Sequence, residues 1–198
     1  MKLILASGNP GKLREIELLL APLGIELVPQ SRLGIAETGE PHDSFRGNAL
    51  AKARHASRAS GLPALADDSG LCVDALGGAP GVRSARYAGE PVSDLKNNKK
   101  LLDEMQGKTN RHARYVCVMA LVRSADDADP LLSEGVWHGE IARAPRGSGG
   151  FGYDPLFRLP ERGLTAAELD PAEKNRISHR AVALSGLLGL LRKNPKFF

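Results

Sequence analysis

The stretch Ala66–Gly70 places two carboxylates next to each other, because Asp67 and Asp68 are adjacent between apolar residues. Two neighbouring aspartates are costly to bury without a counter-charge. A hard divalent cation would offset their repulsion and could hold phosphate oxygens, and one carboxylate could accept a proton from an attacking water. The alternative is an exposed Asx turn, the commoner fate of such a run. The flanking Leu65 and Leu71 favour the buried interpretation.

A second candidate is the loop Ser7–Lys12, which follows a short apolar run and precedes a helical pattern. Backbone N–H groups at the start of a helix favour an anion, and Lys12 adds a formal charge. The loop half-matches a Walker A motif, but Leu13 stands where that motif needs Ser or Thr for magnesium. The sequence therefore favours a phosphate-binding loop that is not a P-loop. The alternative is an ordinary strand–turn–helix connection with a solvated lysine.

A third candidate is the glycine-rich segment 147–155, which holds Phe151 and Tyr153 two residues apart. Glycines let a backbone approach a ligand closely, and aromatic rings can lie beside a flat ligand. The alternative interpretation is a glycine loop that leads into an edge strand.

A fourth candidate is the charged run 174–180 in the first turns of the last predicted helix. A charge run on a helix is usually a solvated face, but anions are favoured at a helix start. His179 and Arg180 are adjacent, so they cannot point the same way along one regular helix. Two weaker candidates are Lys52, in an alanine-rich helix, and Glu37, in a polar loop; each could simply be solvated.

The predicted elements that position these residues are strands that alternate with helices, followed by a hairpin. This order predicts an α/β fold with a mixed sheet. The spacing predicts one long C-terminal helix that begins after the N-cap Asp170, and an acidic turn between two short strands at Asp67 and Asp68. Strands are predicted at 3–6, 25–28, 64–66, 71–73, 114–123 and 131–142, helices at 12–21, 45–60 and 93–106, and loops at 31–41, 77–91 and 146–154.

Length and composition limit the classes of protein. The 198 residues predict one large domain or one domain with two lobes. A net charge of +4 favours an anionic ligand but is too small to indicate nucleic-acid binding. The longest apolar run, Val116–Val122, is too short to span a membrane, and Leu3–Ala6 is too short for a signal peptide. The sequence therefore predicts a cytoplasmic protein with no membrane or nucleic-acid partner. The two cysteines lack metal-ligand spacing, so a zinc site is not expected.

Taken together, the motifs resemble the XTP/dITP pyrophosphatases, also called the inosine triphosphatase family. Several motifs in the right order are far more specific than any one of them. The resemblance spans nearly the whole chain and rests on SGNPGKLREI at 7–16, FRGNALAKA at 45–53, ADDSGL at 66–71, GGAPGVRSARYAG at 77–89, GGFGYDPLF at 149–157 and EKNRISHR at 173–180.

The resemblance implies an activity, a cofactor and a fold. It implies Mg2+-dependent hydrolysis of ITP, dITP and XTP to the monophosphate and pyrophosphate, which removes deaminated purines from the nucleotide pool. It also implies a homodimer and an α/β fold. That fold is a single two-lobed domain over 1–198 around a long mixed sheet, with flanking helices and a cleft between the lobes.

The resemblance also implies roles for individual residues. Asp68 would be the catalytic proton acceptor and a magnesium ligand together with Glu37, and Asp67 would support it. An N–H donor such as Arg180 would favour the C6 oxygen of hypoxanthine or xanthine. The substrate-binding residues would be Ser7, Gly8, Asn9, Pro10, Gly11, Lys12, Lys52, Ser69, Phe151, Gly152, Tyr153, Asp154, Lys174, His179 and Arg180.

Two positions depart from the family pattern. Gly47 stands where the family usually has Glu, and Arg83 stands where an aromatic residue is common.

Three other functions compete with this interpretation. The first alternative is a septum-formation-type pyrophosphatase with the same fold. The segments FGYDP and SHR argue against it. A kinase or GTPase would need a Walker A hydroxyl in place of Leu13. A nucleic-acid-binding protein would need a basic stretch interleaved with aromatic residues, which the sequence lacks.

Overall fold

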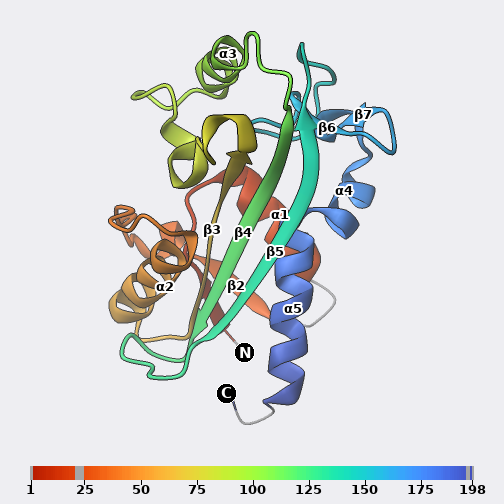
Figure 1. Cartoon of the computed structure of the whole chain (residues 1–198). Coiled ribbons are helices and arrows are strands. Elements are labelled where there is room, and N and C mark those ends of the chain that lie inside the picture. Colours follow the sequence, from red (N-terminus) through yellow and green to blue (C-terminus); the bar gives the residue numbers. More distant parts are fainter. Residues whose placement is uncertain (1, 21–24, 195–196, 198) are drawn as a thin grey trace. The chain divides into compact units, whose positions relative to one another are not determined.

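A computed structural model describes residues 2–20, 25–194 and 197 (Figure 1), and the chain divides into two compact units. Unit 1 comprises Met1–Asp68, Cys117–Gly135 and His179–Phe198. Unit 2 comprises Ser69–Val116 and Val136–Ser178. The segments Ala64–Val73, His112–Val122 and Leu131–Ile141 each have residues in both units. The single domain with a cleft between two lobes stays a prediction.

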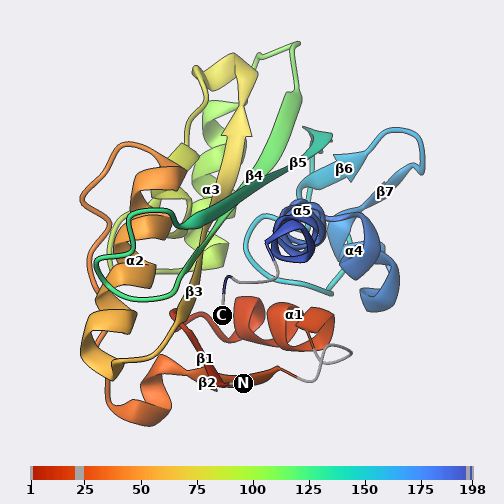
Figure 2. The ribbon, with the colours of Figure 1, turned by 90° about the horizontal axis from the view of Figure 1, so that it is seen from below.

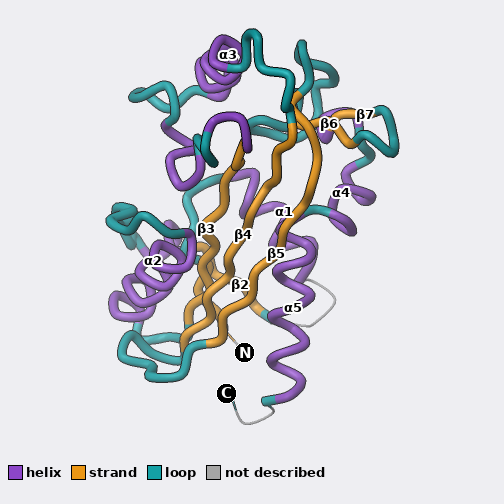
Figure 3. Tube along the Cα trace, in the orientation of Figure 1, coloured by secondary structure: helices purple, strands orange, loops and turns teal. Residues whose placement is uncertain are grey.

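The described residues form one seven-stranded sheet, drawn in orange in Figure 3, in the order β2-β1-β3-β4-β5-β6-β7. Strand β1 pairs in parallel with β2 and β3, while β6 pairs antiparallel with β5 and β7. The sheet is therefore mixed, as predicted. The strands are β1 (Lys2–Leu5), β2 (Glu26–Pro29), β3 (Ala64–Val73), β4 (His112–Val122), β5 (Leu131–Ile141), β6 (Phe157–Leu159) and β7 (Leu164–Thr165).

In unit 1, helices cover both faces of the sheet (Figure 2). Helix α2 (Phe45–Ser60) packs its alanines against one face, beside Ile4, Ala66 and Val118. Helices α1 (Pro10–Leu20) and α5 (His179–Lys193) pack against the other face, beside Leu65 and Met119. Because successive strand residues point to opposite faces, neighbours in β3 must meet different helices.

Unit 2 has its own apolar core, centred on the stacked and tilted rings of Tyr115, Trp137 and Phe157. Its helices are α3 (Asp94–Glu104) and α4 (Pro171–Ile177). In the described part of the chain, short 3-10 helices lie in the connections at Gln30–Leu33, Asp74–Leu76, Gly81–Arg86 and Ala166–Glu168. No helix in the described part of the chain is long and apolar enough to cross a membrane.

Helices with clear local signals occur where the sequence predicts them. Helix α2 has the predicted bounds, with the Ser44 hydroxyl accepting from the Gly47 N–H and Gly61 ending it at φ 69°. The predicted cap Ser93 starts α3. Helix α1 begins two residues before the predicted start, and its predicted last residue, Ala21, lies outside the described residues. Strands β6 and β7 are too short to show in the pattern.

Two predictions about elements are wrong. The acidic turn at Asp67 and Asp68 does not exist, because β3 runs unbroken through Ala64–Val73 with both aspartates in it. The long C-terminal helix is two helices, because Ser178 is extended at ψ 160° and ends α4 before His179 starts α5. The break lets Lys174 and Arg180 bind different carboxylates, described below.

Candidate functional site

The loop between β1 and α1 begins the first cluster of unit 1. The Asn9 carboxamide accepts hydrogen bonds from the Gly11 N–H at 2.8 Å and the Lys12 N–H at 3.1 Å. The sequence predicted that backbone N–H groups at this helix start would bind an anion, but Asn9 already accepts hydrogen bonds from two of them. Ser7 supports the same loop, because its hydroxyl accepts from the Asn9 N–H at 3.3 Å. The anion-binding group that remains is the ammonium of Lys12.

Gly8 in this loop is in close contact with Glu37. A Cβ on Gly8 would lie 1.5 Å from Glu37 Oε1, so no residue with a side chain fits there while Glu37 keeps this position. Glu37 itself is exposed. The structure thus brings Glu37 to the predicted phosphate loop.

Asp67 lies on the β3 face covered by α1 and α5, and it is completely buried. Lys12 Nζ lies 3.1 Å and Arg180 NH2 3.2 Å from Asp67 Oδ2. Arg180 also pairs with Glu15 of α1. The thiol of Cys117, from β4, points at Asp67 with Sγ 3.9 Å from Oδ2. The half-buried ammonium of Lys12 and the buried guanidinium of Arg180 therefore hold this carboxylate in its ionised form.

Asp68 lies on the opposite face, covered by α2. Lys52 Nζ donates to Asp68 Oδ1 at 2.7 Å and to Glu40 Oε1 at 2.5 Å. The carboxamide of Asn48 donates to Asp68 Oδ2 at 3.3 Å and to the His42 carbonyl at 3.0 Å. Helix α2 places Asn48 and Lys52 four residues apart, so both reach the same carboxylate from one helix face.

The two adjacent aspartates have pKa values shifted in opposite directions. Burial raises the pKa of Asp67, but the charges of Lys12 and Arg180 outweigh burial and hold that pKa well below its ordinary value. Burial also raises the pKa of Asp68, and there it prevails over the opposing charges of Lys52 and Lys12. A pair of carboxylates separated in this way has one fixed anion and one stronger base, a common arrangement for acid–base catalysis.

Asp68 and Glu40 are the carboxylates whose positions fit a divalent cation. They already share one cation, the ammonium of Lys52, with their oxygens 2.7 and 2.5 Å from it. The described residues contain no group of three or more His, Cys, Asp and Glu side chains arranged to hold a metal. Mg2+ is commonly held by one or two carboxylates together with substrate phosphates, so this donor set fits it. Glu37, the ligand predicted together with Asp68, lies beside Gly8, and its role as a metal ligand stays a prediction.

The second cluster lies in unit 2 and centres on the loop that leads to Asp154. Asp154 Oδ2 accepts from the Phe151 N–H at 2.9 Å and from Lys174 Nζ at 2.6 Å. The Tyr115 hydroxyl lies 3.4 Å from Asp154 Oδ1. The Lys174 ammonium also lies 5.0 Å from the centre of the Phe151 ring. A buried ion pair thus fixes the loop and leaves the Phe151 ring half-buried.

Helix α3 holds the same loop from another side. Asp94 Oδ2 accepts from the Gly152 N–H at 2.7 Å, and Asn98 Nδ2 donates to the Gly152 carbonyl at 2.9 Å. Gly152 has φ 62°, which favours glycine. The ring of Tyr153 is buried in the core, and its hydroxyl donates to the Ser84 carbonyl at 2.8 Å. Tyr153 therefore supports the loop rather than offering an open ring face.

The predicted site residues fall into these two clusters. Unit 1 holds the loop 7–12, Lys52, Asp67, Asp68 and the buried pair His179 and Arg180. Unit 2 holds Phe151, Gly152, Tyr153, Asp154 and Lys174, together with Ser69, which follows Asp68 in β3. Arg180, predicted to close on a base, has its guanidinium bound to Asp67 and Glu15.

Sequence reasoning missed several residues that complete the clusters. Glu40 stands three residues after Glu37, but no regular spacing connects it to Lys52 or Asp68. Asn48 carries a signal, because it stands four residues before Lys52 in a predicted helix. The remaining contacts are long-range and leave no local pattern; they come from Glu15, Asp94, Asn98 and Tyr115.

Comparisons with known proteins agree on one family. A family model described as the Ham1 family matches residues 3–190. A protein named dITP/XTP pyrophosphatase from Ralstonia nicotianae is 61% identical over 194 residues, covering 96% of each chain. Another of the same name, from Nitrosomonas europaea, is 61% identical and covers 98% of this chain and 95% of its own. The solved structure of a HAM1 protein from Coxiella burnetii matches with a TM-score of 0.91 and 48% identity, covering 98% of this chain and 99% of that one.

Proposed function

Because this chain belongs to the Ham1 family, we propose that it hydrolyses dITP, ITP and XTP to the nucleoside monophosphate and pyrophosphate. The observation that carries the proposal is the pair Asp67 and Asp68, adjacent in β3 and held by different cations with pKa values shifted apart. In the cell this activity removes deaminated purine nucleotides before they enter DNA or RNA.

Asp68 is the general base in this proposal. Its burial raises its pKa and makes it a stronger proton acceptor than an exposed aspartate, so it can take a proton from the attacking water. Lys52 and Asn48 fix the orientation of the carboxylate by hydrogen bonds to its two oxygens. Asp67 remains ionised and holds Lys12 and Arg180 in place, which orients Lys12 toward the loop that receives phosphate.

Mg2+ is the proposed cofactor, held by Asp68 and Glu40. When bound, it neutralises charge on the phosphates and stabilises the charge that develops in the transition state. Lys12 and Lys52 add positive charge for a triphosphate that carries about four negative charges. The carboxylates next to these lysines would repel that triphosphate in the absence of a divalent cation.

The unit 2 cluster is assigned to the base of the nucleotide. The half-buried ring of Phe151 offers a flat apolar face, and the Asp154–Lys174 pair holds the backbone beside it. Base selectivity requires N–H groups that donate a hydrogen bond to the C6 oxygen of hypoxanthine or xanthine and that oppose the amino group of adenine. Because Arg180 is bound to two carboxylates and Lys174 is bound to Asp154, the backbone N–H groups of the loop are the better candidates for this role.

The remaining parts of the proposal are a homodimer, a cytoplasmic location, and one domain over residues 1–198. Family membership supports the dimer and the single domain. The free thiols of Cys72 and Cys117 support a reducing compartment such as the cytoplasm. The proposed partners are the nucleotide substrate and a second copy of the chain, with neither nucleic acid nor membrane.

A product assay tests the proposal directly. The purified chain is given Mg2+ and dITP, XTP, dGTP or dATP, and phosphate is measured with and without added inorganic pyrophosphatase. We expect dITP and XTP to turn over far faster than the others, with phosphate appearing only when pyrophosphatase is added. EDTA should abolish turnover. Phosphate released without pyrophosphatase, or equal use of dATP, would overturn the proposal.

A further inference from the structure

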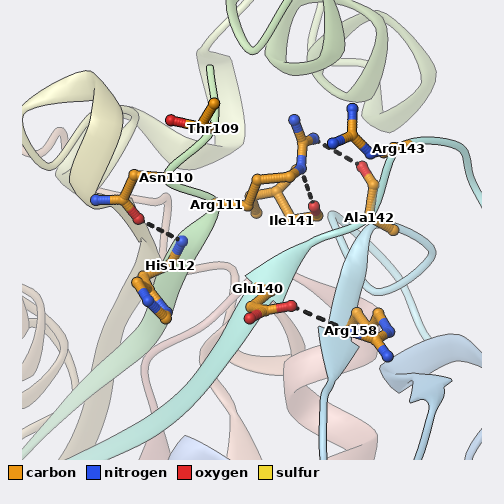
Figure 4. Close-up of a pocket in the computed structure, with 9 residues that line it drawn as sticks. All are labelled: Thr109, Asn110, Arg111, His112, Glu140, Ile141, Ala142, Arg143 and Arg158. Atoms are coloured by element: carbon orange, nitrogen blue, oxygen red, sulfur yellow. Dashed lines mark hydrogen bonds and ion pairs between the residues drawn. The ribbon is translucent and has the colours of Figure 1, made fainter. Parts of the chain in front are cut away.

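Unit 2 contains a basic pocket that the proposed activity does not use. It has a volume of about 410 Å³ and is lined by residues 109–112, 140–143 and Arg158 (Figure 4). These residues come from the segment that leads into β4, from the end of β5 and the residues that follow it, and from the middle of β6. None of them belongs to the Asp68 or the Asp154 cluster.

Arg111 is fixed in this pocket by backbone carbonyls. Its Nε donates to the Ile141 carbonyl at 2.5 Å, NH2 to the Ala142 carbonyl at 2.9 Å and NH1 to the Met105 carbonyl at 3.3 Å. A guanidinium has five N–H groups, so two on Arg111 remain after these three bonds. The backbone therefore holds a positive charge at the pocket wall without supplying a negative one.

Arg143 places a second guanidinium next to the first, as Figure 4 shows. Burial and the nearby charge of Arg143 both lower the pKa of Arg111. Arg143 is exposed and forms no hydrogen bond or ion pair with any residue that the structure describes. The carboxylate of Glu140 is bound to Arg158, with NH1 3.1 Å from Oε2. Three arginines and one glutamate leave the pocket with two uncompensated positive charges.

We propose that this pocket is a binding site for a small phosphate-class anion, separate from the site that hydrolyses the nucleotide. The flat guanidinium of Arg143 can give two parallel N–H bonds to oxyanion oxygens, and Arg111 can add the two N–H groups that its backbone contacts leave. A doubly charged anion would balance the two positive charges and remove the repulsion between the arginines. The volume accepts pyrophosphate as well as inorganic phosphate, and the side chains of Thr109 and Asn110 offer further donors at the rim.

Equilibrium dialysis of the full chain with labelled pyrophosphate in EDTA tests the site. Without a divalent cation the carboxylates around Lys52 and Lys12 disfavour the anion, so binding to this pocket can be measured by itself. We expect one pyrophosphate per chain. Arg143→Glu should weaken binding by about tenfold or more, because it places a carboxylate beside Arg111. The matched control Arg83→Glu, at an exposed arginine of the same unit, should change affinity by less than about twofold.

Two further measurements separate the outcomes. Arg143→Glu should raise the melting temperature of the metal-free chain, and pyrophosphate should raise the melting temperature of the parent but not of this variant. The nucleotide turnover of Arg143→Glu should equal that of the parent. The proposal is overturned if Arg143→Glu binds pyrophosphate as the parent does, if Lys12→Ala alone abolishes binding, or if citrate binds as tightly as pyrophosphate.

Discussion

The two clusters use the same kind of contact, a lysine paired with a buried aspartate, but they differ in charge balance. In unit 2, one lysine meets one aspartate, and neutral donors from Tyr115 and the Phe151 backbone complete the carboxylate. In unit 1, three cationic side chains meet four carboxylates: Lys12, Lys52 and Arg180 meet Glu15, Glu40, Asp67 and Asp68. Counted over these ion pairs, the unit 1 cluster has one negative charge too many, while the buried Asp154–Lys174 pair of unit 2 is neutral.

This difference matches what each cluster is proposed to bind. An excess of carboxylate creates a place for a divalent cation and a base with a raised pKa, which phosphate hydrolysis requires. A neutral, fully hydrogen-bonded pair fixes a loop without attracting ions, which suits an uncharged base. Substitutions in the unit 1 cluster should accordingly change chemistry, and substitutions in the unit 2 cluster should change stability and recognition.

The largest effect is expected for Asp68→Asn. The amide keeps the size of the side chain but cannot accept a proton from water, so kcat for dITP should fall roughly 10²- to 10⁴-fold. The melting temperature should change little, because Lys52 keeps its contact with Glu40. Steady-state kinetics at saturating Mg2+ measures the loss. The control Asp43→Asn, at an exposed carboxylate in the loop before α2, should leave kcat unchanged; near-normal turnover of Asp68→Asn would remove it as the base.

The next effect is on stability, for Asp154→Asn in unit 2. The change leaves the buried Lys174 without its carboxylate, which costs about 3–5 kcal/mol of unfolding free energy when such a pair is broken. Urea unfolding measures it. The exposed pair Lys99–Asp103 provides the control, because Asp103→Asn should cost less than about 1 kcal/mol.

A double variant tests whether the loss of stability comes from the charge of Lys174. Asp154→Asn combined with Lys174→Met removes the unpaired charge and should recover much of the lost stability, while KM for dITP stays raised. If the single variant unfolds at the same urea concentration as the parent, the Asp154–Lys174 pair does not hold unit 2 together.

The sequence predicted the bounds of single helices better than it predicted which distant residues are brought together. Helix α2 has local signals at both ends, a serine cap and a glycine stop, so its bounds were predictable. The pair Asp67 and Asp68 looks locally like a turn, because charged neighbours disfavour a buried strand. Ion pairs with cations from distant parts of the chain reverse that preference; the cations are Lys12, Lys52 and Arg180. Glu40 could not be predicted for the same reason.

A smaller effect is expected for Asn98→Leu, which removes the contact with the Gly152 carbonyl. The Oδ1 of Asn98 is buried and has no hydrogen-bond partner among the described residues, an arrangement that costs stability. Leucine removes that unsatisfied oxygen together with the bond, so the melting temperature should stay equal or rise. KM for dITP should still increase by roughly fivefold, since the loop loses one hydrogen bond of about 1 kcal/mol.

An increase in KM without a loss of melting temperature would show that Asn98 positions the base-binding loop, because a purely structural role would lower the melting temperature as well. Lys96→Leu, at an exposed position of the same helix, is the matched control and should change neither quantity. An unchanged KM for Asn98→Leu would show that α3 does not position the base-binding loop.

The smallest effect is expected at Asp127, in the connection between β4 and β5 of unit 1, outside both clusters. Hydrogen bonds from the Arg123 side chain, against some burial, lower the pKa of Asp127 to about 2. Because this folded pKa is below the unfolded value of about 3.9, the contribution of Asp127 is complete above about pH 4 and is lost as the pH falls through 2. Asp127→Asn should therefore lower the unfolding free energy by roughly 1 kcal/mol at pH 7. Its difference from the parent should shrink toward zero near pH 2 in urea unfolding, with kcat for dITP unchanged at pH 7. A difference that stays constant between pH 7 and pH 2 would show that the charge of Asp127 contributes nothing, and a fall in kcat would show that the connection is coupled to the unit 1 cluster.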